Sequence, residues 1–214
     1  MVWQIPVRGP ILTNSYLFAD EATGHGFLID PGFEPERLLK KIRAYGVKVE
    51  KILLTHAHFD HISAAAAVSE ALDVPIVLRE AGRRYAENPV WNLSAVMGER
   101  EVTLPEERLT FLPDSDGTRV ALAAAPDFAL TVLTTPGHTA DGTTFVSADQ
   151  SLAFVGDSIF QGSYGRCDVP GGDERTLLLS IKEKILTLPE NTVLLPGHGE
   201  ATTVKEERQR PWYQ

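Results

Sequence analysis

Three histidines and one aspartate lie within six residues of one another, in the stretch Thr-His-Ala-His-Phe-Asp-His at positions 55–61. Core positions favour apolar side chains and solvated faces favour Lys and Glu, so neither explains this composition. Imidazole nitrogens and carboxylate oxygens are ligands for transition metals. A strand would turn His61 away from positions 56, 58 and 60, and a helix would place His56 and His58 roughly 200° apart. We therefore expect a loop that divides its donors between two metal sites.

Three more donor-type residues follow apolar runs later in the chain, each directly after a glycine that lets the backbone turn sharply. Taken singly, His138 and His198 would be interpreted as hydrogen-bonded turn histidines and Asp157 as a turn aspartate. In α/β architectures, however, side chains beyond the carboxyl ends of strands meet on one rim of the sheet. We predict one site with seven metal-ligating side chains: His56, His58, Asp60, His61, His138, Asp157 and His198.

The elements that must position these donors are predicted as short strands mixed with helices. Apolar runs between turn residues predict strands at 2–7, 15–19, 27–29, 51–54, 75–78, 118–122, 128–133, 143–146, 152–155 and 193–195. Helical spacing predicts helices at Glu34–Tyr45, Ile62–Leu72, Arg79–Ala86, Asp173–Leu186 and Thr203–Arg210. Because no compositional break divides the chain, we expect a single domain over 1–214. Its two halves share a rhythm of strands followed by helices, which favours an αβ/βα sandwich.

Two regions are harder to interpret. Residues 87–105 have no clean period, and a segment of that length in a compact domain is either a functional flap near the site or a plain surface excursion. His25 lies between two glycines and is interpreted as a solvated turn histidine.

Composition excludes several classes of protein. The chain has 214 residues, 43% of them hydrophobic, and a net charge of −9, so it lacks the basic excess that nucleic acids or anionic membranes attract. Its one cysteine, Cys167, excludes an intrachain disulfide and a Cys-rich zinc module. No secretory signal or membrane-length apolar run is evident, and we expect a cytoplasmic protein.

The combined motifs resemble the metallo-β-lactamase superfamily, and its hydroxyacylglutathione hydrolase (glyoxalase II-like) branch most of all. They are Thr-His-Ala-His-Phe-Asp-His at 55–61, Pro-Gly-His-Thr at 136–139, Gly-Asp at 156–157 and Pro-Gly-His-Gly at 196–199. The resemblance covers the chain from about Asn14 onward. It implies a four-layer αβ/βα fold.

The resemblance also implies a division of the ligands between two divalent ions. His56, His58 and His138 would hold the first ion, Asp60, His61 and His198 the second, and Asp157 would bridge them. Nitrogen and oxygen donors suit Zn²⁺, Fe²⁺ or Mn²⁺, with zinc the ion we expect. Thr55 and Asp30 are candidates for orienting the ligands, or simply strand-end and turn residues.

Such a pair of metals would activate a bridging hydroxide to attack a carbonyl, and Asp60 and Asp157 are the side chains predicted to act in catalysis. The expected substrate is a small anionic thioester such as S-lactoylglutathione. The alternatives are a persulfide dioxygenase of the same fold with one iron on His56, His138 and Asp157, a β-lactamase, a lactonase or other ester hydrolase, and a metal-binding scaffold without activity.

Residues after Asp157 are candidates for the substrate-binding rim. Tyr164 and Arg166 are the predicted contacts, although Arg166 is equally interpretable as an ion pair with Asp168. Cys167 has no adjacent base and is interpreted as a small buried filler. We expect no counterpart here of the C-terminal helical extension that full-length glyoxalase II carries, so the residues that bind glutathione there are not carried over.

Overall fold

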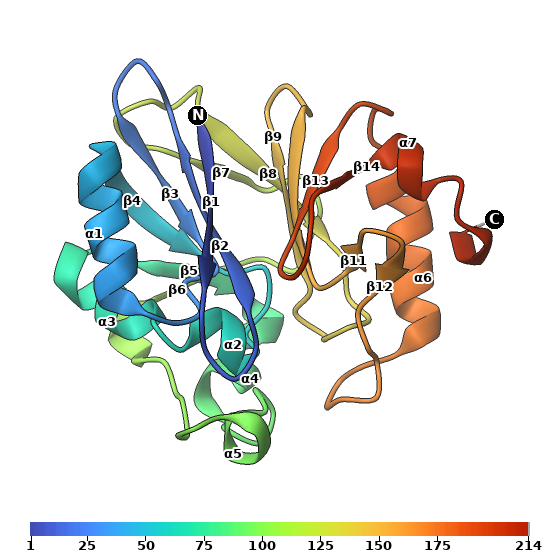
Figure 1. The fold of residues 1–214 in the computed structure, drawn as a ribbon, viewed down its shortest axis with the longest axis horizontal. Coiled ribbons are helices and arrows are strands. Elements are labelled where there is room, and N and C mark those ends of the chain that lie inside the picture. The colour runs from blue at the N-terminus through green and yellow to red at the C-terminus, as the bar shows by residue number, and fades with distance from the viewer. Residues whose placement is uncertain (214) are drawn as a thin grey trace.

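The structure is a computed structural model and describes residues 1–213. Two six-stranded sheets face each other in the middle of the molecule (Figure 1). The first sheet runs in chain order: β1 (Val2–Val7), β2 (Thr13–Ala19), β3 (His25–Ile29), β4 (Lys48–Leu53), β5 (Ile76–Arg79) and β6 (Leu109–Leu112). The second sheet has the order β14 (Thr202–Thr203), β13 (Val193–Pro196), β10 (Leu152–Gly156), β9 (Thr143–Ser147), β8 (Ala129–Thr134) and β7 (Arg119–Ala121).

Helices cover the outer faces of the two sheets, and short elements connect them. The α-helices are α1 (Pro35–Tyr45), α2 (Phe59–Ile62), α3 (Ala65–Leu72), α4 (Arg83–Glu87), α5 (Ser94–Met97), α6 (Glu174–Glu183) and α7 (Val204–Glu207). Single 3-10 turns occupy Glu80–Gly82, Glu106–Arg108, Ile185–Thr187 and Pro211–Tyr213, and a two-stranded ribbon pairs β11 (Ile159–Phe160) with β12 (Ser163–Tyr164). None of the helices within residues 1–213 has the length and apolar character needed to cross a bilayer.

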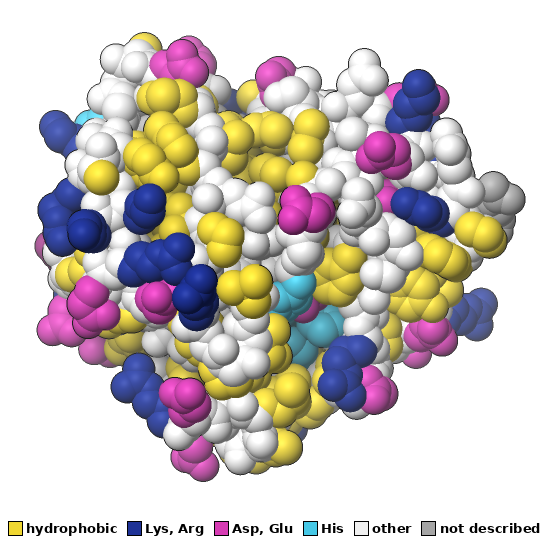
Figure 2. All heavy atoms as spheres, viewed as in Figure 1, with side chains coloured by type: hydrophobic (Ala, Val, Ile, Leu, Met, Phe, Trp, Pro, Cys, Tyr) yellow, Lys and Arg dark blue, Asp and Glu magenta, His cyan; other side chains and the backbone are white. Residues whose placement is uncertain are grey.

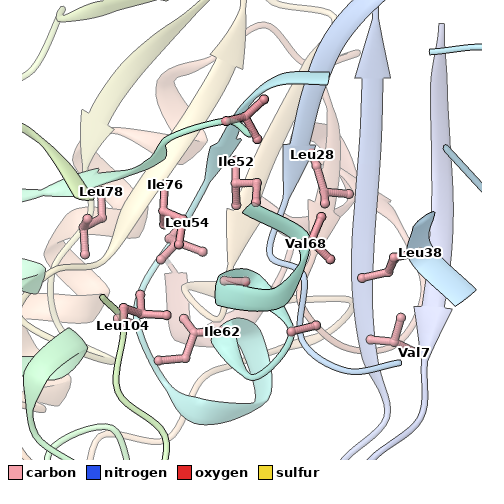
Figure 3. Packing of buried hydrophobic residues seen from close by; sticks show 14 of the residues in the cluster. Val7, Leu28, Leu38, Ile52, Leu54, Ile62, Val68, Ile76, Leu78 and Leu104 are labelled. Carbon is pink, nitrogen blue, oxygen red and sulfur yellow. The ribbon is translucent and has the colours of Figure 1, made fainter. Parts of the chain in front are cut away.

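Three apolar layers hold the molecule together. Aromatic and branched side chains such as Phe27, Phe145 and Phe154 fill the space between the sheets. Leu28, Ile52 and other residues of the first sheet pack against α1 and α3 on its outer face (Figure 3), and a third layer joins the second sheet to α6. The predicted four-layer αβ/βα sandwich is therefore confirmed.

Strand direction brings the donor-bearing loops to one end of the molecule. Strand β4 lies parallel to β3 and β5. In the second sheet β8 and β10 are both antiparallel to β9, and β13 is parallel to β10, so β8, β10 and β13 all point the same way. The loops that follow β4, β8, β10 and β13 carry the predicted donors. They therefore meet at one rim, as expected for carboxyl strand ends.

Two predicted helices begin later than expected. The helix predicted at Ile62–Leu72 is α3, which starts at Ala65, because the Ala64 amide donates to the Pro31 and Gly32 carbonyls and interrupts the helical ladder. In the helix predicted at Arg79–Ala86, Arg79 is instead the last residue of β5, and α4 starts only at Arg83. The buried Arg79 guanidinium donates to two carbonyls of the loop at 140–142, which holds this residue in the strand.

Several short elements were not predicted. Strand β6 completes the first sheet beside β5, but at four residues it is too short for a period-two pattern to distinguish it from a loop. Strands β11, β12 and β14 are two residues long, which is too short for any periodicity to appear. Conversely, the last predicted helix, Thr203–Arg210, shrinks to α7, where Thr203 and Glu206 form a capping box.

Candidate metal centre

The histidine-rich stretch is half loop and half helix. His56, Ala57 and His58 continue from β4 in non-helical backbone, and His58 has extended dihedrals (φ −69°, ψ 149°) as the residue before α2. Asp60 and His61 then lie on α2 itself, so the prediction of a loop throughout is wrong for this half. The change of backbone between His58 and Phe59 is what separates the donors into two sets. The prediction of two sets agrees with this geometry.

All seven predicted donors meet in one place. Three sets have donor atoms within 4.8 Å of one another: His56, His58 and His138; Asp60, His61 and His198; and His56, His61 and Asp157. Asp157 lies between the others, with Oδ1 3.3 Å from His61 Nε2 and Oδ2 3.2 Å from His198 Nε2. Imidazole rings are visible at the bottom of a hollow on the surface (Figure 2).

Partners outside the cluster fix which ring nitrogens face inward. Three Nδ1–H groups donate outward: that of His138 to the Arg166 carbonyl at 2.6 Å, that of His61 to Asp30 at 2.9 Å, and that of His198 to the Leu12 carbonyl at 2.8 Å. Because each Nδ1 donates outward, each Nε2 faces the interior of the cluster, where it offers a lone pair to a cation once it carries no proton. This is the tautomer that a metal-ligating histidine requires.

His56 is oriented by a relay through Thr55. The Thr55 hydroxyl donates to Asp30 Oδ2 at 2.6 Å, so its oxygen is left to accept from His56 Nδ1 at 3.2 Å. Asp30 also accepts the Thr55 amide at 2.8 Å, and this carboxylate therefore supports one histidine on each side of the cluster. Thr55 and Asp30 thus have the ligand-orienting contacts expected of them.

Several buried donor atoms have no partner within the chain. Among residues 1–213, His56 Nε2, His58 Nε2, His61 Nε2 and Asp157 Oδ1 are buried and make no hydrogen bond. Leaving such groups buried and unpaired costs free energy. Divalent cations placed among these lone pairs and carboxylates would satisfy them. The residues present therefore fit a centre of two metal ions.

Histidine pKa values are shifted in opposite directions in the two donor sets. Burial, together with the neighbouring imidazoles, lowers the pKa of His56 well below its ordinary value and that of His58 to about 3. Burial also disfavours charge on His61 and His198, but Asp157 and Asp60 outweigh it. The pKa of His61 is raised well above its usual range and that of His198 to about 10.

Asp141 supports the loop between the first two histidines and was not identified from the sequence. Its Oδ2 accepts the Ala57 amide at 2.9 Å, directly between His56 and His58. Burial raises the pKa of Asp141, while the Arg79 guanidinium acts in the opposite direction. The available signal was an acidic residue three positions after His138, but a turn aspartate has the same pattern.

The metal centre opens into a cavity of about 310 Å³. Its lining combines five of the donors with mainly apolar residues: Ile11, His58, Phe59, Asp60, Leu93, Met97, His138, Asp157, Phe160, Gly165, Arg166 and His198. Leu93 and Met97 belong to the segment 87–105, so that segment lies at the site, as the flap interpretation requires. Its core is fixed by the buried Asn92 amide, which donates to the Tyr85 and Val102 carbonyls.

The two predicted substrate contacts are placed differently. Arg166 lines the cavity, but its guanidinium forms a bidentate ion pair with Asp168 at 2.7 and 2.8 Å. Tyr164 is not among the described residues lining the cavity, and its hydroxyl donates to Glu174. The ion pair was one of the two interpretations of Arg166 from sequence.

Two other residues were also assigned from the sequence. Cys167 is half-buried, and burial raises its pKa to about 11, which agrees with a packing role. The interpretation of His25 as a solvated turn residue is wrong, because it starts β3 and its Nδ1 lies 2.8 Å from Glu50.

Known proteins share both the sequence and the fold. Residues 8–198 match the model of the metallo-beta-lactamase superfamily. The chain is 39% identical to the probable metallo-hydrolase YqgX of Bacillus subtilis (strain 168), over 99% of this chain and 97% of that protein. It is 32% identical to the hydroxyacylglutathione hydrolase GloC of Haemophilus influenzae, over 95% of this chain and 93% of that one.

Two solved structures agree with this placement. The BLEG-1 B3 metallo-beta-lactamase superposes with a TM-score of 0.89 at 34% identity and covers 100% of both chains. TTHA1623, solved in a di-iron-bound form, gives a TM-score of 0.82 at 34% identity over 98% of this chain and 99% of its own. The chain therefore belongs to the metallo-beta-lactamase superfamily, and its histidine-rich centre is of the dinuclear type.

Proposed function

We propose that this protein is a metal-dependent hydrolase that cleaves thioesters, of which S-lactoylglutathione is the reference substrate. The observation that carries the proposal is the complete set of seven donors, whose ligand atoms converge beside one cavity. The similarity to the hydroxyacylglutathione hydrolase of Haemophilus influenzae supports the thioester as the bond that is cleaved.

The metals would be held by the seven donors in the two sets given above, with Asp157 between them. When bound, they would lower the pKa of a water molecule and polarise the substrate carbonyl. Zinc is the ion we favour, while the di-iron form of TTHA1623 supports iron as an alternative.

The chain's own residues supply orientation and shielding. Asp60 Oδ2 lies 3.2 Å from His198 Nε2 at the cavity wall, where it is placed to accept a hydrogen bond from the attacking water. The Thr13 hydroxyl donates a hydrogen bond to the same Asp60 oxygen at 3.5 Å. Phe59 and Phe160 flank the donors and limit the access of further water molecules to the reacting carbonyl.

Hydrolysis of β-lactams is the second candidate. The whole chain superposes on the BLEG-1 B3 metallo-beta-lactamase, and no other structural comparison given above has a TM-score as high. An amide in a strained ring requires the same attack by water on a carbonyl, so the two activities would share one centre. Only the substrate distinguishes them.

One experiment tests the proposal against its alternatives. The purified protein is loaded with Zn²⁺, Fe²⁺ or Mn²⁺, its metal content is measured, and it is given S-lactoylglutathione, a chromogenic cephalosporin and glutathione persulfide. We expect two ions per chain and release of thiol from the thioester. One iron per chain, with oxygen consumed on the persulfide and no thiol released from the thioester, would instead identify a dioxygenase.

A further inference from the structure

The cavity beside the metal centre is apolar and nearly free of uncompensated charge. Apart from the metal-binding side chains, the described lining residues are Ile11, Phe59, Leu93, Met97, Phe160, Gly165 and Arg166. Arg166 is the one charged side chain in this set, and its guanidinium is already paired with Asp168. A carboxylate of a substrate would therefore find no free cation on these walls, whereas an apolar group would be removed from water.

One wall of the cavity is held in a strained backbone conformation. Leu93 has φ +68° and ψ 0°, the left-handed region that glycine and asparagine adopt far more readily than leucine. Neighbouring contacts fix this conformation, because the Asn92 side chain accepts the Ser94 amide at 3.0 Å and the Asn92 carbonyl accepts the Phe59 amide at 2.9 Å. Residues held in such conformations cluster at ligand sites.

The same contacts tie the apolar wall to the metal-binding helix. Phe59, whose amide bonds to Asn92, is the residue directly before Asp60 on α2. Met97, the last residue of α5, is 41% exposed. The rings of Phe160 and His198 lie with 5.9 Å between their centroids. These contacts fix the position of the apolar wall relative to the metal-binding side chains. It is formed before the substrate binds, which lowers the entropic cost of binding.

We propose that the cavity binds an unbranched apolar acyl chain, so that medium-chain acyl thioesters are better substrates than short hydroxyacyl ones. The inference rests on the proposed function, since it names the acyl group of that reaction. The acyl side is assigned to the cavity because common carrier thiols such as glutathione are polar and charged, and their carboxylates find no free cation among its lining residues. The thiol portion then leaves toward solvent.

A chain-length series tests the proposal. S-acylglutathiones with acyl groups of two, four, six and eight carbons are compared with S-lactoylglutathione on the metal-loaded protein. We expect kcat/KM to rise about threefold to fourfold per methylene until the cavity is filled. A flat or falling series, with thioester hydrolysis intact, would overturn the acyl-chain proposal and leave the proposed function standing.

Binding provides a readout that does not depend on turnover. Calorimetry with acetate, butanoate, hexanoate and octanoate, the products of the series, should show the dissociation constant falling with chain length. If no thioester is hydrolysed but this trend is present, the proposed function fails and the assignment of the cavity stands. Dissociation constants that do not depend on chain length would overturn that assignment.

Two variants localise the effect, and a third is a matched control. Met97→Lys places a charge on the apolar wall, and Leu93→Asn keeps the left-handed backbone while removing the apolar side chain. Each should reduce the kcat/KM ratio of octanoyl to acetyl thioester by about tenfold, mainly through KM. Val96→Lys introduces the same charge one residue away, at a side chain that is 75% exposed and absent from the described lining. An equal effect of Val96→Lys and Met97→Lys would contradict the proposed wall.

Discussion

The two donor sets of the metal centre differ in the pKa values of their histidines. The three-histidine set (His56, His58 and His138) contains no carboxylate, and burial lowers the pKa of His56 and His58. The mixed set (Asp60, His61 and His198) is close to Asp157, and its two histidines have raised pKa values. In the metal-free protein at neutral pH, His56 and His58 are therefore neutral, while the mixed set holds protons between carboxylates.

This difference predicts different behaviour toward a cation. At the three-histidine set an ion meets His56 and His58, which are already neutral. At the mixed set it must first displace protons that Asp60 and Asp157 stabilise, although the negative charge of these carboxylates then favours the cation. The two ions are thus held by unlike chemistry, neutral imidazoles on one side and carboxylates on the other.

The largest expected effect comes from emptying the mixed set. His61→Ala removes the side chain that faces both Asp60 and Asp157, and Asp60→Ala removes the carboxylate at the cavity wall. Either variant should reduce the metal content from two ions to one and lower thioester turnover by orders of magnitude, because attack by water requires both ions in the proposed function. Full turnover with one ion bound would refute the two-metal mechanism.

A matched pair of buried aspartates should weaken the two sets selectively. Asp30 accepts from His61 of the mixed set, whereas Asp141 accepts the amide between His56 and His58. Asp30→Asn is expected to reduce metal affinity at the mixed set by about 10- to 100-fold and, through the Thr55 contact with His56, to have a smaller effect on the three-histidine set, whereas Asp141→Asn should act on the three-histidine set alone. Titration with Co²⁺ measures both, because the two ligand fields give different spectra. The same loss at both sets in each variant would show that the sets are not independent.

The pH dependence of metal uptake gives a smaller effect. The pKa of His198 is about 10 in the metal-free chain, so below pH 10 it carries a proton that an incoming ion displaces. For each proton that the ion displaces, the metal affinity of the mixed set should fall about tenfold when the pH decreases by one unit. His58, with a pKa of about 3, is neutral throughout pH 6–9, so affinity at the three-histidine set should change much less. Equal slopes for the two sets would contradict this comparison.

Much of the centre could be predicted because its donors are unusual residues for their local context. Five of the six histidines stand at strand ends, where neither packing nor solubility accounts for them. The four-layer architecture followed from strands alternating with helices at ordinary spacing. Both depend on local patterns, which are legible in a single sequence.

The unpredicted features depend on contacts between distant segments. Asp141 acts 84 positions away from Ala57, and the Arg166 carbonyl that fixes His138 is a backbone atom that no side-chain pattern reports. Residues 87–105 lacked a period because Asn92 holds them in irregular backbone, through its side-chain bonds to the Tyr85 and Val102 carbonyls and through its own carbonyl, which accepts the distant Phe59 amide. Helix α2 is only four residues long, so no helical period could reveal that Asp60 and His61 are helical.

The smallest expected effect concerns Arg166, whose backbone and side chain have separate roles. Its carbonyl accepts from His138 of the three-histidine set, while its guanidinium pairs with Asp168 at the surface. Arg166→Ala keeps the carbonyl, so metal content at both sets should be unchanged. Because the guanidinium is already paired with Asp168, the KM for S-lactoylglutathione should change by less than about threefold. The loss of the ion pair itself should matter little, because exposed ion pairs contribute little free energy. Asp168→Ala is the control that frees the guanidinium. A KM at least about tenfold higher in Arg166→Ala, with Asp168→Ala unaffected, would instead assign Arg166 to a substrate carboxylate.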